Sequence, residues 1–253
     1  MQRYFLEDSL SSDQQTVQVT GDVAHHIIRV MRMNKGDKVY LVFQNKQSFL
    51  AEIAKLESTE VVFALLEEEK EVKELPVDVT IAHGFPKGDK LELIVQKTTE
   101  LGVHSVLAFP SDRSVAKWDA KKLLKKQERL TKIAKEAAEQ SQRTYQPLVE
   151  LLDTKQKLLK KFQDYDFVMV AYEEAAKQGE CFKLASFLTK IKRHTKILVI
   201  FGSEGGLSKE EVKIFLAHEA FIVGLGPRIL RTETAPLYFL SAVSYELELR
   251  LKN

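Results

Sequence analysis

Two glycine-rich stretches near the end of the chain constrain its fold more than any other feature. Each follows an apolar run typical of a buried strand: Lys196–Phe201 leads into GSEGG (202–206), and residues 220–225 lead into GLGPRILRTETAP (224–236). The fixed φ of Pro236 suits the first turn of a helix after the second loop. Ligands in α/β sheets bind beyond the carboxyl ends of the strands. The pattern therefore predicts a composite small-molecule pocket built from both loops.

Neither loop matches a common nucleotide-binding fingerprint. GSEGGLSK lacks the GxxxxGK[ST] spacing, and GLGPRI departs from GxGxxG at the third glycine. This disfavours a P-loop kinase and a Rossmann dehydrogenase. A single glycine after a strand signals only a turn, but two such loops, one of them followed by Arg and Thr-Glu-Thr, favour a ligand site.

Strands and helices alternate over residues 74–253. The expected strands are nearly continuous apolar runs, as in parallel sheets that are buried on both faces: 77–82, 103–109, 167–172, 196–201 and 220–225. Between them, Asp89 with Glu92 and Ser208 with Glu211 have the spacing of helix capping boxes. Helical patterns also cover residues 119–143, 177–191 and 236–251. The prediction is one α/β domain.

The first 73 residues have a different pattern. Thr20 is a candidate N-cap for a short helix, and short strand patterns at 38–43, 48–56 and 60–66 are separated by polar turns. This organisation predicts a small β-barrel. An acidic linker, residues 67–74, precedes Pro76, so we place the domain boundary near residue 73.

Composition narrows the functional classes. The formal net charge is +2, so nucleic-acid binding must come from local basic surfaces. Cys181 is the single cysteine, which rules out an intramolecular disulfide and a cysteine-ligated zinc site. The N-terminal residues lack the features of a secretory signal, and no apolar stretch approaches membrane-span length. We expect a cytoplasmic protein that binds no metal.

Basic residues gather in two places. One is the helical pattern at 119–143, and the other is the N-terminal part of the chain around Arg29 and Arg32. A lysine-rich helix is usually a solvated face, but this density of positive charge also suits contacts with a phosphate backbone. We predict RNA contacts by Arg3, Arg29, Arg32, Lys87, Lys122, Lys125 and Lys126.

The histidines give weaker signals. His25 and His26 are adjacent and point in different directions on a helix, so they do not form an i, i+4 metal pair. His83 follows an expected strand and is therefore a candidate for contact with substrate.

Several motifs together resemble one known family. GSEGGLSKEE (202–211) and LGPRILRTETAPL (225–237) resemble the closing signature of ribosomal RNA small subunit methyltransferase E, a bacterial uridine-N3 methyltransferase of the SPOUT superfamily. The resemblance continues in FPKGDKLELIVQKTTELG (85–102), RSVAKW (113–118), KIAKEAAEQSQR (132–143) and HHIIRVMRMNKGD (25–37), and so covers nearly the whole chain. One departure is Ser203, where the family usually has proline.

The resemblance implies a PUA-like β-barrel at residues 1–73, which binds RNA, and a SPOUT methyltransferase domain at residues 74–253. The second domain would be an α/β parallel sheet with a C-terminal trefoil knot. It further implies a homodimer that binds S-adenosylmethionine and acts on 16S ribosomal RNA, with the assembled small subunit as the expected substrate. Matched motif by motif, the cofactor-binding residues would be Ile200, Phe201, Gly202, Gly205, Gly206, Leu225, Gly226, Ile229, Leu230, Arg231, Thr232 and Ala235.

The implied chemistry suggests further roles. Uridine N3 must lose its proton before it can attack a methyl group, and a nearby cation would stabilise the resulting anion. Candidates for the cation are Arg113, Arg143 and Arg231, and candidates for the base are Glu139 and Glu233. Because N3 lies on the Watson–Crick edge, the target uridine must be unpaired or flipped out.

Two alternatives stay open at this stage. One is a SPOUT methyltransferase that acts on another RNA or on a ribose 2′-hydroxyl. The other is a non-catalytic RNA-binding assembly factor that has kept the fold.

Overall fold

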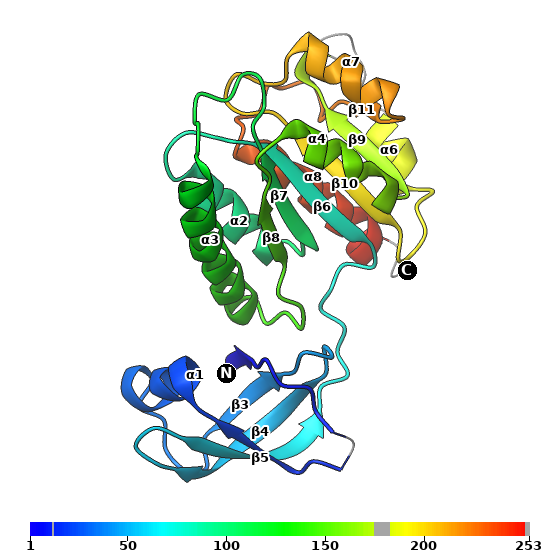
Figure 1. Cartoon of the computed structure of the whole chain (residues 1–253). Coiled ribbons are helices and arrows are strands. Elements are labelled where there is room, and N and C mark those ends of the chain that lie inside the picture. Colours follow the sequence, from blue (N-terminus) through cyan, green and yellow to red (C-terminus); the bar gives the residue numbers. More distant parts are fainter. Residues whose placement is uncertain (12, 175–182, 251–253) are drawn as a thin grey trace. The chain divides into compact units, whose positions relative to one another are not determined.

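The chain divides into two compact units (Figure 1). The computed structural model describes residues 1–11, 13–174 and 183–250. The first unit contains Met1–Glu74 together with Ala138–Gln146, and the second contains Leu75–Ala137 and Pro147–Asn253. The segment Ala138–Gln146 was not assigned to the N-terminal unit from the sequence. It is the end of a long helix and the loop that follows.

The first unit is a five-stranded sheet. Its strands are β1 (Gln2–Phe5), β2 (Thr16–Val19), β3 (Lys38–Val42), β4 (Ser48–Leu56) and β5 (Val61–Glu68), in the order β1-β3-β4-β5-β2. Two register shifts between β4 and β5 interrupt the pairing, and such irregularities bend a sheet. The predicted small barrel is therefore a curled half-barrel, with β1 and β2 at its edges.

A short helix covers part of this sheet. Helix α1 (Gly21–His25) continues as the π-helical turn η1 (His26–Val30), and its buried residues Ala24 and Ile27 join the apolar core of the unit. Thr20 does occupy the N-cap position, but its side chain makes no capping hydrogen bond.

Arg3 belongs to the interior of the first unit. Its side chain is buried, and Nη2 donates to both carboxylate oxygens of Glu69, at 2.9 and 2.7 Å. Nη1 donates to Ser48 Oγ at 3.1 Å, and the guanidinium lies over the Tyr40 ring. A buried arginine needs such partners because an unpaired buried charge is costly. The prediction that Arg3 contacts RNA is therefore wrong: its charge is used inside the protein.

The second unit is a six-stranded parallel sheet. Its strands are β6 (Asp78–Gly84), β7 (Ser105–Phe109), β8 (Leu148–Leu151), β9 (Phe167–Ala171), β10 (Lys196–Phe201) and β11 (Phe221–Val223), in the order β11-β9-β10-β6-β7-β8. Five of them were predicted from their apolar runs. The short edge strand β8 was missed because it has only four residues and Glu150 interrupts its apolar run.

Helices cover both faces of this sheet (Figure 1). One apolar cluster joins alternate strand residues to α2 (Lys90–Glu100), α3 (Ala120–Gln140), α6 (Lys183–Leu188) and α8 (Thr234–Ser244), which continues as η3 (Tyr245–Arg250). A second cluster joins the other strand residues to α4 (Lys155–Lys160), η2 (Phe162–Asp164) and α7 (Lys209–Ala217). Burial on both faces explains the continuous apolar strands.

The N-termini of α2 and α7 can be compared with the two predicted capping boxes. Ser208 and Glu211 form the expected capping box at the start of α7. Asp89 precedes α2 but makes no side-chain capping bond, and Glu92 instead pairs with Arg129 at 2.6 Å. The expected helix at 177–191 is partly described, as α6, while Cys181 lies outside the described residues. The trefoil knot stays a prediction.

Within the described residues, none of the helices is both long and apolar enough to cross a membrane.

Candidate functional site

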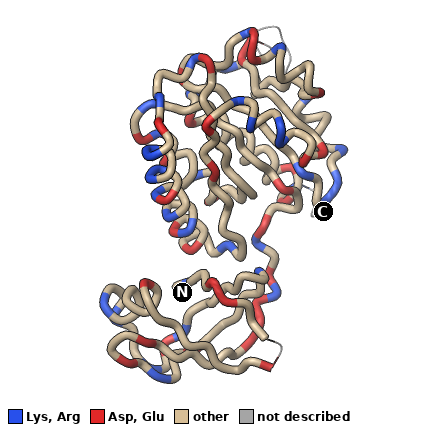
Figure 2. The backbone as a smooth tube through the Cα atoms, in the orientation of Figure 1, with Lys and Arg blue, Asp and Glu red and all other residues tan. Residues whose placement is uncertain are grey.

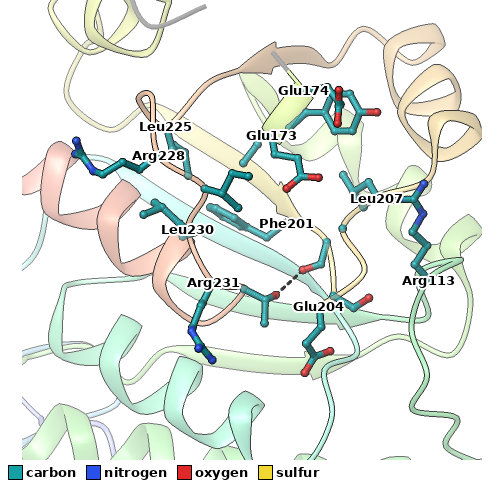
Figure 3. A pocket seen from close by; sticks show the side chains of 18 of the residues that line it. Arg113, Glu173, Glu174, Phe201, Glu204, Leu207, Leu225, Arg228, Leu230 and Arg231 are labelled. Carbon is teal, nitrogen blue, oxygen red and sulfur yellow. Dashed lines mark hydrogen bonds between the residues drawn. The ribbon is translucent and has the colours of Figure 1, made fainter. Parts of the chain in front are cut away.

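The two glycine loops meet around one pocket of about 570 Å³. It lies beyond the carboxyl ends of β9, β10 and β11, three strands that are neighbours in the sheet. Its volume is in the range typical of small-molecule sites. Figure 3 shows Phe201 inside the pocket, with Leu225, Leu230 and Arg231 from the second loop and Glu204 from the first around it.

The first loop (202–206) closes on itself. The backbone N–H of Gly206 donates to the Ser203 carbonyl at 2.9 Å, and Gly206 has a φ of +71°. A Cβ at Gly202 would lie only 2.3 Å from the Gly206 carbonyl carbon, far inside van der Waals contact. Glycine at 202 is thus required by the close approach of two backbone segments, whereas at 206 it is required by the backbone angle.

A buried carboxylate ties this loop to the segment that follows β7. Glu211 is fully buried, and its two oxygens accept the backbone N–H of Asp112 at 2.8 Å and that of Ser208 at 2.9 Å. Hydrogen bonds from Lys155 and Ser208 lower the pKa of Asp112. Arg113, the next residue, donates from Nη1 to the Gly205 carbonyl at 2.9 Å. The capping glutamate of α7 thereby places Arg113 at the pocket.

The second loop (224–233) contacts the first through Thr232. Its hydroxyl donates to the Gly202 carbonyl at 2.8 Å (dashed line in Figure 3). Gly226, with a φ of +87°, adopts a backbone conformation that side chains other than glycine rarely accept. His83, the predicted substrate contact, is completely buried beneath Thr232 and does not line the pocket.

An ion-pair bridge links the loops at the pocket edge. Lys90 Nζ lies 3.3 Å from Glu204 Oε1 and 3.2 Å from Glu233 Oε2. Burial alone would raise the pKa of Glu204, but the backbone N–H of Lys87 and the ammonium of Lys90 lower it. The pKa of Glu233 is lowered by its own backbone N–H and by Lys90. A lowered pKa makes Glu233 a weaker base than a free glutamate.

Most of the predicted cofactor residues lie together. Ten of the twelve line the pocket, and the exceptions are Ile200 and Gly205. Ile200 is buried in the cluster under α7, and Gly205 bonds to Arg113 through its carbonyl. Several lining residues were not predicted: Lys90, Tyr172, Glu173, Glu174, Ser203, Glu204, Leu207, Lys209, Pro227 and Arg228. Tyr172 to Glu174 follow β9, and the position of β9 beside β10 was the missing signal.

The five predicted catalytic residues are divided between the units. Arg113 and Arg231 line the pocket, and Glu233 lies beside it as the partner of Lys90. Glu139 and Arg143 belong to the first unit. Arg143 is buried and donates from Nε to Glu74 Oε2 at 3.0 Å. Burial and the charge of Glu139 raise the pKa of Tyr4 to about 12. Catalytic roles for Glu139 and Arg143 stay predictions.

The predicted RNA-contacting residues other than Arg3 are at least partly accessible. Arg29, Arg32, Lys87, Lys122 and Lys125 are exposed. Lys126 is half-buried, and its ammonium lies 4.9 Å from the centre of the Trp118 ring. Figure 2 shows basic residues along much of α3. Among the described residues, no group of three or more His, Cys, Asp or Glu side chains could hold a metal ion.

Two protein-family models match the chain, and they follow each other in the same order as the predicted β-barrel and the predicted α/β domain. One for an RNA methyltransferase PUA domain matches residues 19–66, and one for an RNA methyltransferase domain matches residues 73–244.

The chain is also similar to individual proteins along nearly its full length. It is 47% identical over 251 residues to ribosomal RNA small subunit methyltransferase E of Bacillus subtilis, with 98% of each chain covered. It is 30% identical to the Synechocystis protein of the same name, covering 92% of this chain and 74% of that one. The structure of the Neisseria gonorrhoeae protein bound to S-adenosyl methionine has a TM-score of 0.81 and 26% identity, covering 96% and 97% of the two chains. The chain therefore belongs to the ribosomal RNA small subunit methyltransferase E family.

Proposed function

We propose that this protein is an S-adenosylmethionine-dependent methyltransferase that methylates N3 of a uridine in small-subunit (16S) ribosomal RNA. The observation that carries the proposal is the meeting of the two glycine loops around one pocket at the carboxyl end of a parallel sheet. Similarity over nearly the full chain to methyltransferases named for the small-subunit RNA supports the choice of substrate.

The residues of the pocket suit S-adenosylmethionine. Phe201, Leu225 and Leu230 provide apolar walls. The loops expose backbone N–H and carbonyl groups that can pair with the polar edge of an adenine. Glycine at 202 lets the Gly206 backbone approach closely, which closes the first loop at the edge of the pocket. The cofactor's sulfonium would supply the methyl group, and the N. gonorrhoeae structure is of a relative that binds this cofactor.

The charged side chains suggest how the reaction is assisted. Arg113 and Arg231 line the pocket and would stabilise the negative charge on the uracil ring after N3 loses its proton. Glu233 is a less suitable base, because its pKa is lowered and it pairs with Lys90. We therefore propose that the cations promote ionisation of N3 and that the proton passes to solvent.

The RNA would be bound by exposed basic residues in both units. In the second unit they are Lys87 and the α3 lysines Lys121, Lys122 and Lys125. Arg29 and Arg32 provide a basic surface on the first unit. We further propose a cytoplasmic homodimer, because α8 and η3 expose Tyr238, Tyr245 and Leu249, an apolar surface that a second copy would cover.

The decisive experiment is methyl transfer from labelled S-adenosylmethionine to small ribosomal subunits that lack this modification. Naked ribosomal RNA and transfer RNA are parallel substrates, and the products are digested to nucleosides for mass spectrometry. The expected product is 3-methyluridine, formed on assembled subunits. Label on a ribose or on transfer RNA would refute the proposed substrate, and a protein that binds no cofactor would refute the proposed activity.

The variant Arg231→Gln tests the proposed role of the pocket cations. It keeps a polar side chain but removes the charge, so we expect a lower turnover rate. Arg129→Gln is the control, because Arg129 pairs with Glu92 away from the pocket. Equal rates for the two variants would contradict the role of Arg231.

A further inference from the structure

A buried histidine that takes no part in the proposed chemistry lies directly beneath the pocket. His83 is the penultimate residue of β6 and is completely buried. It is paired across the sheet with Phe201, the last residue of β10. The two rings are stacked, with 6.5 Å between their centroids and 15° between their planes. The imidazole is therefore held between two strand ends, and Phe201 itself lines the pocket.

The imidazole connects both glycine loops through hydrogen bonds. Nδ1 lies 2.7 Å from the carbonyl oxygen of Gly84. On the other side, Nε2 lies 3.0 Å from the hydroxyl of Thr232 and 3.2 Å from its carbonyl oxygen. The same hydroxyl lies 2.8 Å from the Gly202 carbonyl. A continuous polar path thus runs from β6 through the second loop to the first.

The path depends on which atoms of His83 and Thr232 carry a hydrogen. Nδ1 must carry a hydrogen, because the Gly84 carbonyl can only accept. In a neutral ring, Nε2 is then an acceptor. The Thr232 hydroxyl has one hydrogen, and it faces two acceptors, Nε2 and the Gly202 carbonyl. A neutral His83 therefore shares one hydrogen between the two loop contacts.

The surroundings of His83 set its charge. Complete burial lowers the pKa of the imidazole. The backbone carbonyls of Gly84 and Thr232, and the charges of Glu204 and Glu233, act in the opposite direction but do not outweigh burial. Lys90 lies between these two carboxylates and offsets part of their charge. Burial favours the neutral ring, whereas the carbonyl oxygens that face its two nitrogens favour the protonated one; the net direction is a lowered pKa.

We propose that His83 is a positioning residue for the cofactor: through the Thr232 hydroxyl it holds the second glycine loop against the Gly202 carbonyl of the first. This rests on the proposed function, since the pocket is taken to bind S-adenosylmethionine. A ligand group that donates a hydrogen bond to Gly202 would release the Thr232 hydrogen to Nε2. The arrangement of the loops and the occupancy of the pocket are then linked through one hydroxyl.

The test compares Thr232→Val with Thr232→Ser in the full-length protein. Valine keeps the shape of the side chain but removes the hydroxyl, whereas serine keeps the hydroxyl. Thr98→Val is the control for the same change of side chain, because the Thr98 hydroxyl bonds only within α2. His83→Gln and His83→Leu form a second pair, in which glutamine keeps hydrogen-bonding groups and leucine has none. Affinity for S-adenosylmethionine is measured by calorimetry.

We expect Thr232→Val to weaken binding about tenfold or more, the scale set by leaving a buried polar group unpaired. Thr98→Val should bind like the wild type, and Thr232→Ser should lose much less affinity than Thr232→Val. Nitrogen-15 NMR of histidine-labelled protein should show His83 with its hydrogen on Nδ1, and its Nε2 signal should move both in Thr232→Val and when the cofactor binds.

The outcomes separate this inference from the proposed function. A wild-type protein that binds no S-adenosylmethionine would contradict the proposed function itself. If the wild type binds, equal affinity of Thr232→Val would overturn the inference alone, as would equal losses in the serine and valine variants. An Nε2 signal that does not move in Thr232→Val would also overturn it. Should the His83 variants fail to fold, the Thr232 pair still decides.

Discussion

Gly202→Ala adds a single methyl group at the point where the first glycine loop is most crowded. The new Cβ would lie 2.3 Å from the Gly206 carbonyl carbon and 2.7 Å from both the Cα and the oxygen of Gly206. Carbon atoms in favourable contact are about 3.5–4.0 Å apart, so the two backbone segments must separate by more than about 1 Å. All three obstructing atoms belong to the backbone, so no side-chain rotation can relieve the contact.

The expected cost follows from what this separation breaks. Overpacking costs about 1–3 kcal/mol in unfolding free energy. The bond from Gly206 N–H to the Ser203 carbonyl and the bond from Thr232 to the Gly202 carbonyl would be strained together, and each contributes about 1 kcal/mol. We expect a loss of about 2–4 kcal/mol in stability, and loss of cofactor binding because both loops are displaced.

Stability can be followed by urea unfolding of the second unit. Trp118, the single tryptophan of the chain, lies in this unit and packs 4.2 Å from the Phe85 ring. Its fluorescence therefore reports on the unit that contains the pocket. Calorimetry with S-adenosylmethionine measures binding in the same samples.

Gly88→Ala is the matched control. Gly88 has a φ of +60°, and a Cβ there would meet no atom within 4 Å. This variant should lose about 1–2 kcal/mol from backbone strain and keep its affinity for the cofactor. If Gly202→Ala is as stable as the wild type and binds the cofactor equally well, Gly202 and Gly206 do not make the close backbone contact that closes the first loop.

Three further predictions concern Ser203, His83 and α3. Ser203 Oγ is buried at the pocket and has no hydrogen-bond partner among the described residues, so Ser203→Ala should raise stability by about 1 kcal/mol or more in urea unfolding, while a decrease would show that the hydroxyl has a partner. Burial lowers the pKa of His83 in the folded protein. Below a pH of about 6.5 the histidine of the unfolded chain takes up a proton, whereas the buried histidine does not. The unfolded state is therefore favoured, and the stability of the protein falls, as the pH falls. His83→Gln should remove this part of the pH dependence, up to about 1.4 kcal/mol per pH unit, and an unchanged slope would contradict a buried neutral ring. Replacing Lys121, Lys122 and Lys125 by Glu should reduce the slope of log K against log salt for RNA binding by about 2, while cofactor affinity stays constant. An unaltered salt slope would show that α3 is only a solvated surface.

The sequence predicted the features that depend on neighbouring residues. Buried parallel strands are apolar along their whole length, so five of the six were recognisable from their runs. The Ser208–Glu211 capping box was recognisable because its two members are three residues apart. The glycine loops were recognisable because each follows such a strand. Local patterns were therefore sufficient to predict the α/β class and the pocket.

The same local reasoning failed where a distant partner decided the outcome. Asp89 has the spacing of a cap, but Glu92 pairs with Arg129, which lies on another helix. Arg3 has the composition of an RNA contact, but Glu69 and Ser48 enclose it in the core. A charged side chain gives no indication in the sequence of whether a partner will be buried with it.

By itself, the sequence determined the order of the elements, the two glycine loops and the resemblance to a methyltransferase family. Only the tertiary structure decided that β9 lies beside β10, which brings Tyr172, Glu173 and Glu174 to the pocket. It also decided that His83 lies under Thr232 and that Lys90 joins Glu204 to Glu233. The physical reason is that strand order and side-chain pairing depend on contacts between residues far apart in the chain, and the spacing of residues along the sequence does not encode them.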